Sequence, residues 1–216
     1  MKIIEFNEPH RRKHFDFFRA MEMPFYNMVA PVPVQVLREY IRDHGLHFSG
    51  TMVYLVSKVA NSIPEFRWRI REDKVIEHDT VHPSFTVRTE DSDVFSFCYV
   101  AFVDDYPVFI NALQSAQAAM RTSPSLEDAP ERDDYLFMSS VPWVHFTGFS
   151  HAMHIPVRDS VPRISWGKIK SVNTEDLMPL GVQVHHSVVD GRHVGLFFER
   201  FEEYCMSPEL ALRIGQ

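Results

Sequence analysis

The sequence predicts an α/β domain in which amphipathic helices pack on β-strands. Three observations lead to this class. Apolar side chains recur at helical spacing in several segments, and segments rich in β-branched and aromatic residues lie between them. Near the C-terminal end, a strand pattern over residues 182–186 passes directly into a helical pattern that includes Val194, Phe197 and Phe201. At 216 residues without a Pro/Gly/Ser-rich linker, the whole of 1–216 fits a single domain.

Helices are expected wherever one face of a segment is apolar. The first expected helix, residues 10–21, places Phe15, Phe18 and Met21 on a shared face. Later segments carry comparable stripes, which are more typical of core packing than of a binding surface. These further helices are expected over residues 31–45, 50–62 and 107–121.

Strands are expected between these helices and through most of the second half of the chain. Each segment carries β-branched or aromatic residues and is bounded by turn-forming residues such as Asp and Pro. The expected strands cover residues 25–29, 67–71, 74–77, 84–88, 94–103, 135–138, 143–149, 163–169 and 180–186. Residues 122–134 are rich in Ser, Pro, Asp and Glu, which predicts an exposed connection.

Charge and composition exclude several classes of partner. A net charge of -7 and a pI near 5.9 argue against nucleic-acid binding. The N-terminus lacks a signal-peptide pattern, and no apolar run is long enough to cross a bilayer, so we expect a soluble, cytoplasmic protein without a membrane partner. The two cysteines, Cys98 and Cys205, fall within apolar patterns, which favours buried free thiols.

The candidate chemistry lies in the string His185-His186-Ser187-Val188-Val189-Asp190-Gly191. A histidine is suited to take a proton from a hydroxyl near neutral pH, and a nearby carboxylate can orient it. Asp190 precedes the expected helix, where a carboxylate also suits the unpaired backbone N–H groups. The alternative is that the histidines merely end a strand and Asp190 merely caps a helix. The full His-His-x-x-x-Asp-Gly string at a strand-to-helix junction favours the catalytic interpretation.

This string is similar to that of the coenzyme-A-dependent acyltransferases, which include chloramphenicol acetyltransferase and the catalytic domain of dihydrolipoamide acyltransferases. Further segments resemble the type A chloramphenicol acetyltransferase family in order and spacing, so the resemblance spans nearly the whole chain. These segments are residues 64–67, 81–87 and 142–147. The resemblance implies a two-layer α/β sandwich with a mixed β-sheet, assembled as a homotrimer whose active sites lie between subunits.

The resemblance also implies a role for each candidate residue. His186 acts as general base on the acceptor hydroxyl, which attacks acetyl-CoA directly without an acyl-enzyme, and Ser139 stabilises the oxyanion. Asp190 is structural and forms a salt bridge with Arg11. From the residues alone, Ser139 would be a polar residue ending a strand and Arg11 a surface residue. Ser165 matches a family threonine near the acceptor, although an ordinary strand serine explains it equally well.

The two substrates are assigned to residues in the same way. Four aromatic residues match positions that line the acceptor pocket: Phe17, Phe18, Tyr26 and Phe95. His151 and Arg163 stand where the family carries apolar residues near the drug, which favours a more polar acceptor. On the coenzyme side, Ile169 replaces a tyrosine near the adenine, and His47 replaces a lysine near a phosphate.

Three functions therefore stay open. The first is chloramphenicol O-acetylation, with an implied role in antibiotic resistance. The second is acetyl-CoA-dependent O-acetylation of a more polar hydroxyl compound, and the third is a catalytically inactive ligand-binding homologue. Metal binding is not expected, because His145, His151 and His154 lack a cysteine or carboxylate at a ligand-like spacing.

Overall fold

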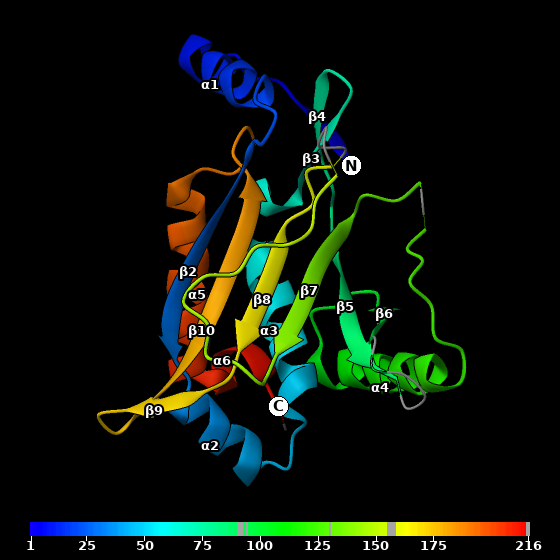
Figure 1. Cartoon of the computed structure of the whole chain (residues 1–216), viewed down its shortest axis with the longest axis vertical. Helices are drawn as coiled ribbons and strands as arrows, with labels where there is room; N and C mark the ends of the chain where they lie inside the picture. Colours follow the sequence, from blue (N-terminus) through cyan, green and yellow to red (C-terminus); the bar gives the residue numbers. More distant parts are fainter. Residues whose placement is uncertain (90–92, 94, 130, 155–158, 215–216) are drawn as a thin grey trace.

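A computed structural model describes residues 1–89, 93, 95–129, 131–154 and 159–214 (Figure 1). Its centre is a seven-stranded sheet. Six strands follow one another in the order β2-β10-β8-β7-β5-β6, and the seventh, β9, pairs with β10. Strands β5, β7 and β8 are mutually parallel, and the other pairs are antiparallel, so the expected mixed sheet is confirmed. The strands are β2 (Phe25–Pro33), β5 (His82–Arg88), β6 (Phe95–Tyr99), β7 (Tyr135–Val141), β8 (Arg163–Gly167), β9 (Lys170–Val172) and β10 (Glu175–His185).

Helices cover one face of this sheet, and Figure 1 shows α3 and α5 behind the strands. Helix α3 is buried without interruption from Gly50 to Ala60, because it lies between the sheet, α4 and α5. The apolar side chains of α5, including Val194, Phe197 and Phe201, point into the same core. This layer comprises α2 (Gln35–Asp43), α3 (Phe48–Ser62), α4 (Tyr106–Thr122), α5 (Gly191–Met206) and α6 (Pro208–Leu212).

A smaller unit lies at the end of the molecule where β10 finishes. Helix α1 (Pro9–Arg19) sits there beside a three-stranded antiparallel sheet of order β1-β4-β3 (Figure 1). Its strands are β1 (Lys2–Ile4), β3 (Trp68–Arg71) and β4 (Lys74–Glu77), and the 3-10 helix η1 (Pro64–Arg67) precedes β3. The arrangement brings α1 to the end of β10 and the start of α5, which is where the His-His-x-x-x-Asp-Gly string lies.

Phe149 and His151, between β7 and β8, pack on the opposite face of the sheet. The Asn27 side chain donates to the carbonyl of Phe149, and the backbone N–H of His151 donates to Gln183 Oε1 at 3.0 Å. The strand predicted from the sequence over residues 143–149 is not present, and this prediction is wrong. Val144 N–H donates to the Val141 carbonyl, so a turn reverses the chain, and the side chains of Trp143 and Val144 are exposed.

The start of the second expected helix was also wrong. Residues 31–33 belong to β2 instead, where Pro31 lies opposite Pro179 and Pro33 opposite Leu177 of β10. A proline cannot donate a ladder hydrogen bond, so prolines are tolerated in an edge strand when the missing N–H points outward. Strand β2 is such an edge, and the helix begins only at Gln35.

Two further expectations concern the chain as a whole. Cys98 and Cys205 are both buried and free, as expected. Among the helices of the described residues, none combines the length and the apolar character that crossing a membrane requires.

Candidate active site

The ring of His186 is fixed at the end of β10 by backbone and aromatic contacts. The backbone N–H of His186 donates to the Pro24 carbonyl at 2.8 Å, which ties the residue to the chain entering β2. The imidazole stacks on Phe18 with ring centroids 3.8 Å apart, and the ring of Tyr26 lies 4.5 Å away. Its Nδ1 is buried without a hydrogen-bond partner and lies 3.9 Å from Asp190 Oδ2. The Nε2 atom is therefore the nitrogen left for a ligand.

The neighbouring histidine, His185, has a different environment. Its side chain is buried, and Nδ1 accepts a hydrogen bond from the Ser187 N–H at 3.3 Å. Burial lowers the pKa of His185 to about 4, so it is neutral at neutral pH. Of the two motif histidines, His186 is the more exposed.

Besides lying near His186, Asp190 caps helix α5 and contacts His14. It is the N-cap of α5: its Oδ1 accepts from the Arg192 N–H at 3.3 Å, and its own N–H donates to His193 Nδ1 at 3.0 Å. Its Oδ2 lies 3.4 Å from His14 Nε2. Burial raises the pKa of the Asp190 carboxyl, but the Arg192 N–H and the nearby histidines outweigh it, so the net shift is downward.

Arg11 does not form the direct salt bridge with Asp190 that the resemblance implies. Its guanidinium donates to the carbonyls of Ser187, at 2.9 Å, and Val188, at 3.4 Å, and its Nη1 lies 3.2 Å from His14 Nδ1. Among the residues that the structure describes, the ion pairs of Asp190 join it to His14 and His186. Arg11 thus holds the turn after His186 by hydrogen bonds to its carbonyls. Its path of side-chain contacts to Asp190 runs through His14.

His14 is the residue of this cluster that the sequence reasoning missed. It lies three residues after Arg11 and four before Phe18 on α1, so all three share one face of the helix. This spacing was a usable signal, because Arg11 and Phe18 were both candidates. The ring of His14 lies 4.7 Å from Phe18 and 5.5 Å from His186.

The second cluster of candidates lies across strands β5, β7 and β8. Ser139 is directly opposite Ser165 in the parallel pair β7–β8, and its Oγ lies 3.4 Å from Thr86 Oγ1. Ser139, Thr86 and Phe95 line a cavity of about 500 Å³ that also reaches Trp143 and His47. Its mixture of hydroxyl, aromatic and cationic groups suits an elongated ligand with polar and apolar parts.

Polar residues lie on the outer face of the sheet beside these serines. The His151 ring is largely buried with Nε2 2.9 Å from Ser165 Oγ, and burial together with the nearby Arg163 lowers its pKa to about 4. Arg163 is buried and forms a two-pronged ion pair with Asp159, at 3.0 and 2.9 Å. Asp159 was not among the sequence candidates.

The structure does not bring these two clusters together in one chain. Ser139 lies opposite Ser165, which lies opposite Gly181 of β10. From Gly181 to His185 the strand advances by about 13 Å, and crossing β8 to reach β7 adds about 10 Å sideways. His186 and Ser139 of the same chain are therefore too far apart to act on one reacting carbon.

The remaining candidates have clear positions. Phe17 is 62% exposed and makes an edge contact with the Phe18 ring. His47 caps α3 by accepting from the Gly50 N–H at 3.2 Å and lines the 500 Å³ cavity. Ile169 packs against the core.

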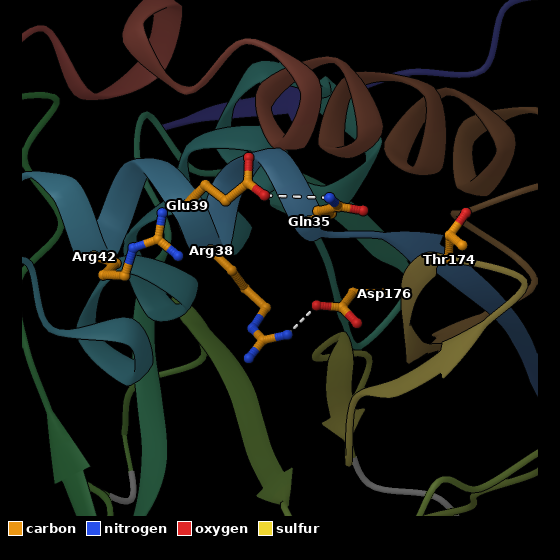
Figure 2. A pocket seen from close by; sticks show the side chains of 6 residues that line it. All are labelled: Gln35, Arg38, Glu39, Arg42, Thr174 and Asp176. Carbon is orange, nitrogen blue, oxygen red and sulfur yellow. Dashed lines mark hydrogen bonds and ion pairs between the residues drawn. The ribbon is translucent and has the colours of Figure 1, made fainter.

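A separate cavity of about 450 Å³ lies between α2 and the turn that joins β9 to β10 (Figure 2). Several of its polar groups contact one another: Arg38 pairs with Asp176, and Gln35 donates to Glu39 Oε1 at 3.2 Å. None of the candidate residues lines it, so we assign it no role in the chemistry.

Comparison with known proteins identifies relatives over nearly the whole chain. The family model described as chloramphenicol acetyltransferase matches residues 1–202. A Chloramphenicol acetyltransferase of Klebsiella sp is 26% identical over 94% of this chain and 92% of its own length. Chloramphenicol acetyltransferase 3 of Escherichia coli is 29% identical, with 91% of this chain and 93% of its own length covered.

Solved structures agree at the level of the fold. A chloramphenicol acetyltransferase superposes with a TM-score of 0.79 at 23% identity, covering 94% of this chain and 99% of its own. A dihydrolipoamide acetyltransferase of Azotobacter vinelandii superposes with a TM-score of 0.67 at 15% identity, over 97% of this chain and 94% of its own.

Proposed function

The chain belongs to the chloramphenicol acetyltransferase family, and from this premise we propose that it transfers acetyl from acetyl-CoA to a hydroxyl group of an acceptor such as chloramphenicol. The fixed ring of His186 supports a role as general base. The buried Nδ1 faces Asp190, which leaves Nε2 to take the hydroxyl proton.

The reaction needs only these groups and the two substrates. As His186 Nε2 takes the proton, the acceptor oxygen attacks the thioester carbonyl carbon. The Ser139 hydroxyl donates to the developing oxyanion. Collapse of the tetrahedral intermediate breaks the carbon–sulfur bond, and the departing thiolate takes the proton back from His186, so that the products are the acetyl ester and CoA.

The coenzyme would occupy the cavity that reaches from Ser139 to His47. Its lining residues fit a long thioester: the Ser139 and Thr86 hydroxyls lie near the reacting end, and His47 contributes a polar group further away. Because His47 replaces a lysine and already caps α3, we expect weaker electrostatic attraction for a phosphate than a lysine would give.

The observation that carries this proposal furthest is the separation of His186 from Ser139 within one chain. A homotrimer whose sites lie between subunits removes the difficulty, because His186 of one subunit can face Ser139 of the next. Neither residue then suffices alone, which makes the assembly part of the active site.

Complementation between subunits tests this arrangement. Trimers refolded from an equal mixture of His186→Ala and Ser139→Ala chains should recover about a quarter of the wild-type rate, since about a quarter of random interfaces pair two intact residues. Each variant alone should be almost inactive. A mixture as inactive as its components, with trimers shown by light scattering, would contradict a shared site.

The activity itself is tested by thiol release from acetyl-CoA with and without chloramphenicol. We expect chloramphenicol-dependent release that His186→Ala abolishes, while His44→Ala, a change at an exposed histidine at the end of α2, leaves it intact. No release with any hydroxyl compound, from a folded protein, would favour a ligand-binding homologue instead.

One observation favours a second acceptor class. The His151–Ser165 contact and the Arg163–Asp159 ion pair place polar groups where the family has apolar ones. A more polar hydroxyl compound would then be the better acceptor. A panel of hydroxyl compounds in the same assay decides the matter, and chloramphenicol as the best of them would rule this alternative out.

A further inference from the structure

Three side chains form a continuous chain of contacts that ends at the proposed base. Arg11 Nη1 lies 3.2 Å from His14 Nδ1, and His14 Nε2 lies 3.4 Å from Asp190 Oδ2. The same carboxylate oxygen lies 3.9 Å from Nδ1 of His186. The order is thus Arg11, His14, Asp190, His186, and it joins α1 to the start of α5 and the end of β10.

The first contact fixes where His14 carries its proton. A guanidinium can only donate, so His14 Nδ1 must accept and therefore holds a lone pair. A neutral imidazole then carries its single N–H on Nε2, which is the atom that faces Asp190. Burial and the nearby Arg11 lower the pKa of His14, and both effects favour this neutral form.

The second and third contacts concern the carboxylate. Asp190 Oδ1 is engaged by the Arg192 N–H at the helix cap, at 3.3 Å, which leaves Oδ2 to be placed by other groups. A donor on His14 lies 3.4 Å from Oδ2, and His186 Nδ1 lies 3.9 Å from the same oxygen. A proton on His186 Nδ1 is favoured by the negative oxygen, and the Nε2 lone pair then stays free for the acceptor.

We propose that His14 is a positioning residue for the transfer reaction: as a donor held in one tautomer by Arg11, it holds Asp190 Oδ2 against Nδ1 of His186. This inference rests on the proposed function, since it assumes that His186 is the base. It adds a residue to the reaction, and it gives Arg11 a task other than a direct salt bridge with Asp190.

The same three side chains could instead be considered as ligands of a cation, because suitable atoms of His14, His186 and Asp190 lie within 4.8 Å of one another. The Arg11 contact argues against this. A metal on His14 Nε2 needs a lone pair there, which moves the N–H to Nδ1, where Arg11 also donates. A neutral His14 with its N–H on Nε2 meets Arg11 and Asp190 without this conflict.

Two substitutions at His14 separate positioning from packing. His14→Phe keeps a ring against Phe18 but removes the donor, and we expect kcat to fall about tenfold or more with the KM for acetyl-CoA nearly unchanged. His14→Gln can place an amide N–H near the former Nε2, and it should restore most of the rate. His10→Phe, on the exposed first turn of the same helix, is the matched control and should behave like wild type.

A double-mutant cycle then shows whether His14 acts through Asp190. In an Asp190→Asn background, His14→Phe should cost far less than it does in the wild-type protein, because its target is already altered. Losses that multiply would mean that His14 supports the fold independently, and they would overturn the proposal. Thermal unfolding of each variant identifies a loss of rate that comes only from loss of structure.

A spectroscopic readout does not depend on activity. In protein labelled with nitrogen-15 at histidine, the His14 signal, identified by its absence in His14→Gln, should show the Nε2–H tautomer near neutral pH. An Nδ1–H tautomer would overturn the inference whatever the enzyme does. If wild-type protein transfers acetyl to no acceptor but the tautomer is as expected, the proposed function fails. If transfer is fast and unaffected by His14→Phe, the positioning role fails alone.

Discussion

The imidazole of His186 lies on the ring of Phe18, with centroids 3.8 Å apart and planes inclined by 20°. Phe18 comes from α1 and His186 from the end of β10, so the docking of the N-terminal helix determines how the proposed base is held. Phe18 was assigned to the acceptor pocket from the resemblance, and the structure adds this contact with the base.

We therefore expect Phe18→Ala to slow transfer. A stacked aromatic pair contributes about 0.5–1.5 kcal/mol, so loss of the stack should lower kcat by about two- to tenfold if the ring must be held for proton transfer. Phe18→Tyr preserves the stack and serves as the control. Steady-state kinetics with saturating acetyl-CoA measures the effect, and an Ala variant with wild-type kcat would show that other contacts suffice.

The ion pair between Arg163 and Asp159 should contribute to the free energy of unfolding. Arg163→Leu leaves Asp159, which is only partly exposed, without its two-pronged partner, and we expect the free energy of unfolding to drop by about 1–3 kcal/mol. Adding Asp159→Leu should recover part of this loss. Urea unfolding at one fixed protein concentration measures both variants, and losses that simply add would show that the two side chains are not coupled.

Stability should also depend on pH through His151. Its pKa is about 4 in the folded protein because of burial and Arg163, against 6.5 for a free side chain. The unfolded chain then binds the proton more readily, so stability is fully present above pH 6.5 and is lost as the pH falls toward 4, by at most about 1.4 kcal/mol per pH unit.

The matching variant for this pH effect is His151→Leu. It should flatten the pH dependence of the urea midpoint between pH 4 and 6.5, without removing it. His185 also has a pKa of about 4 and contributes in the same window with the same sign. Identical pH profiles for the variant and the wild type would contradict the assignment to His151.

Gly167 offers a test of the loop that borders the cavity proposed for the coenzyme. A Cβ at this position would lie 2.7 Å from the Val144 carbonyl and 2.8 Å from the Phe146 ring, so Gly167→Ala must displace that segment. We expect a loss of about 1–3 kcal/mol in stability and a higher KM for acetyl-CoA, because Trp143 lines the cavity.

Gly195→Ala is the control for this substitution. Nothing lies within 4 Å of a Cβ there, and the residue is inside α5, where alanine favours the helix by about 0.5–1 kcal/mol over glycine. It should raise stability and leave the KM unchanged. A Gly167→Ala variant with the KM of wild type would show that Trp143 does not depend on this close packing.

Local patterns explain why much of the fold was predictable. The apolar stripe over residues 50–62 became the buried helix α3, and the strand-to-helix junction at His186 separates β10 from α5, because both patterns are set by neighbours in sequence. Residues 143–149 show the limit of this approach. Their aromatic and β-branched residues suit a strand, but the turn at Val141 takes them off the sheet.

The candidate site was predictable where the resemblance supplied a motif and unpredictable where it depended on docking. His186 and Asp190 follow from the motif and Arg11 from the wider resemblance, but the contact of His14 with Asp190 joins residues far apart in the chain and needs the position of α1. The pairing of Arg163 with Asp159 was likewise invisible, because four-residue spacing indicates a pair only within a helix, and Arg163 begins a strand.

The prolines of β2 affect the hydrogen-bonding groups that the edge of the sheet offers. Pro31 faces Pro179 across the ladder, a pairing in which neither residue can donate, so the missing N–H of Pro31 and that of Pro33 two residues on lie along the outer margin of the sheet. A further strand arriving there would meet no donors at either position. Addition of a strand to the sheet is therefore disfavoured along this stretch, where the edge offers acceptors but lacks these two donors.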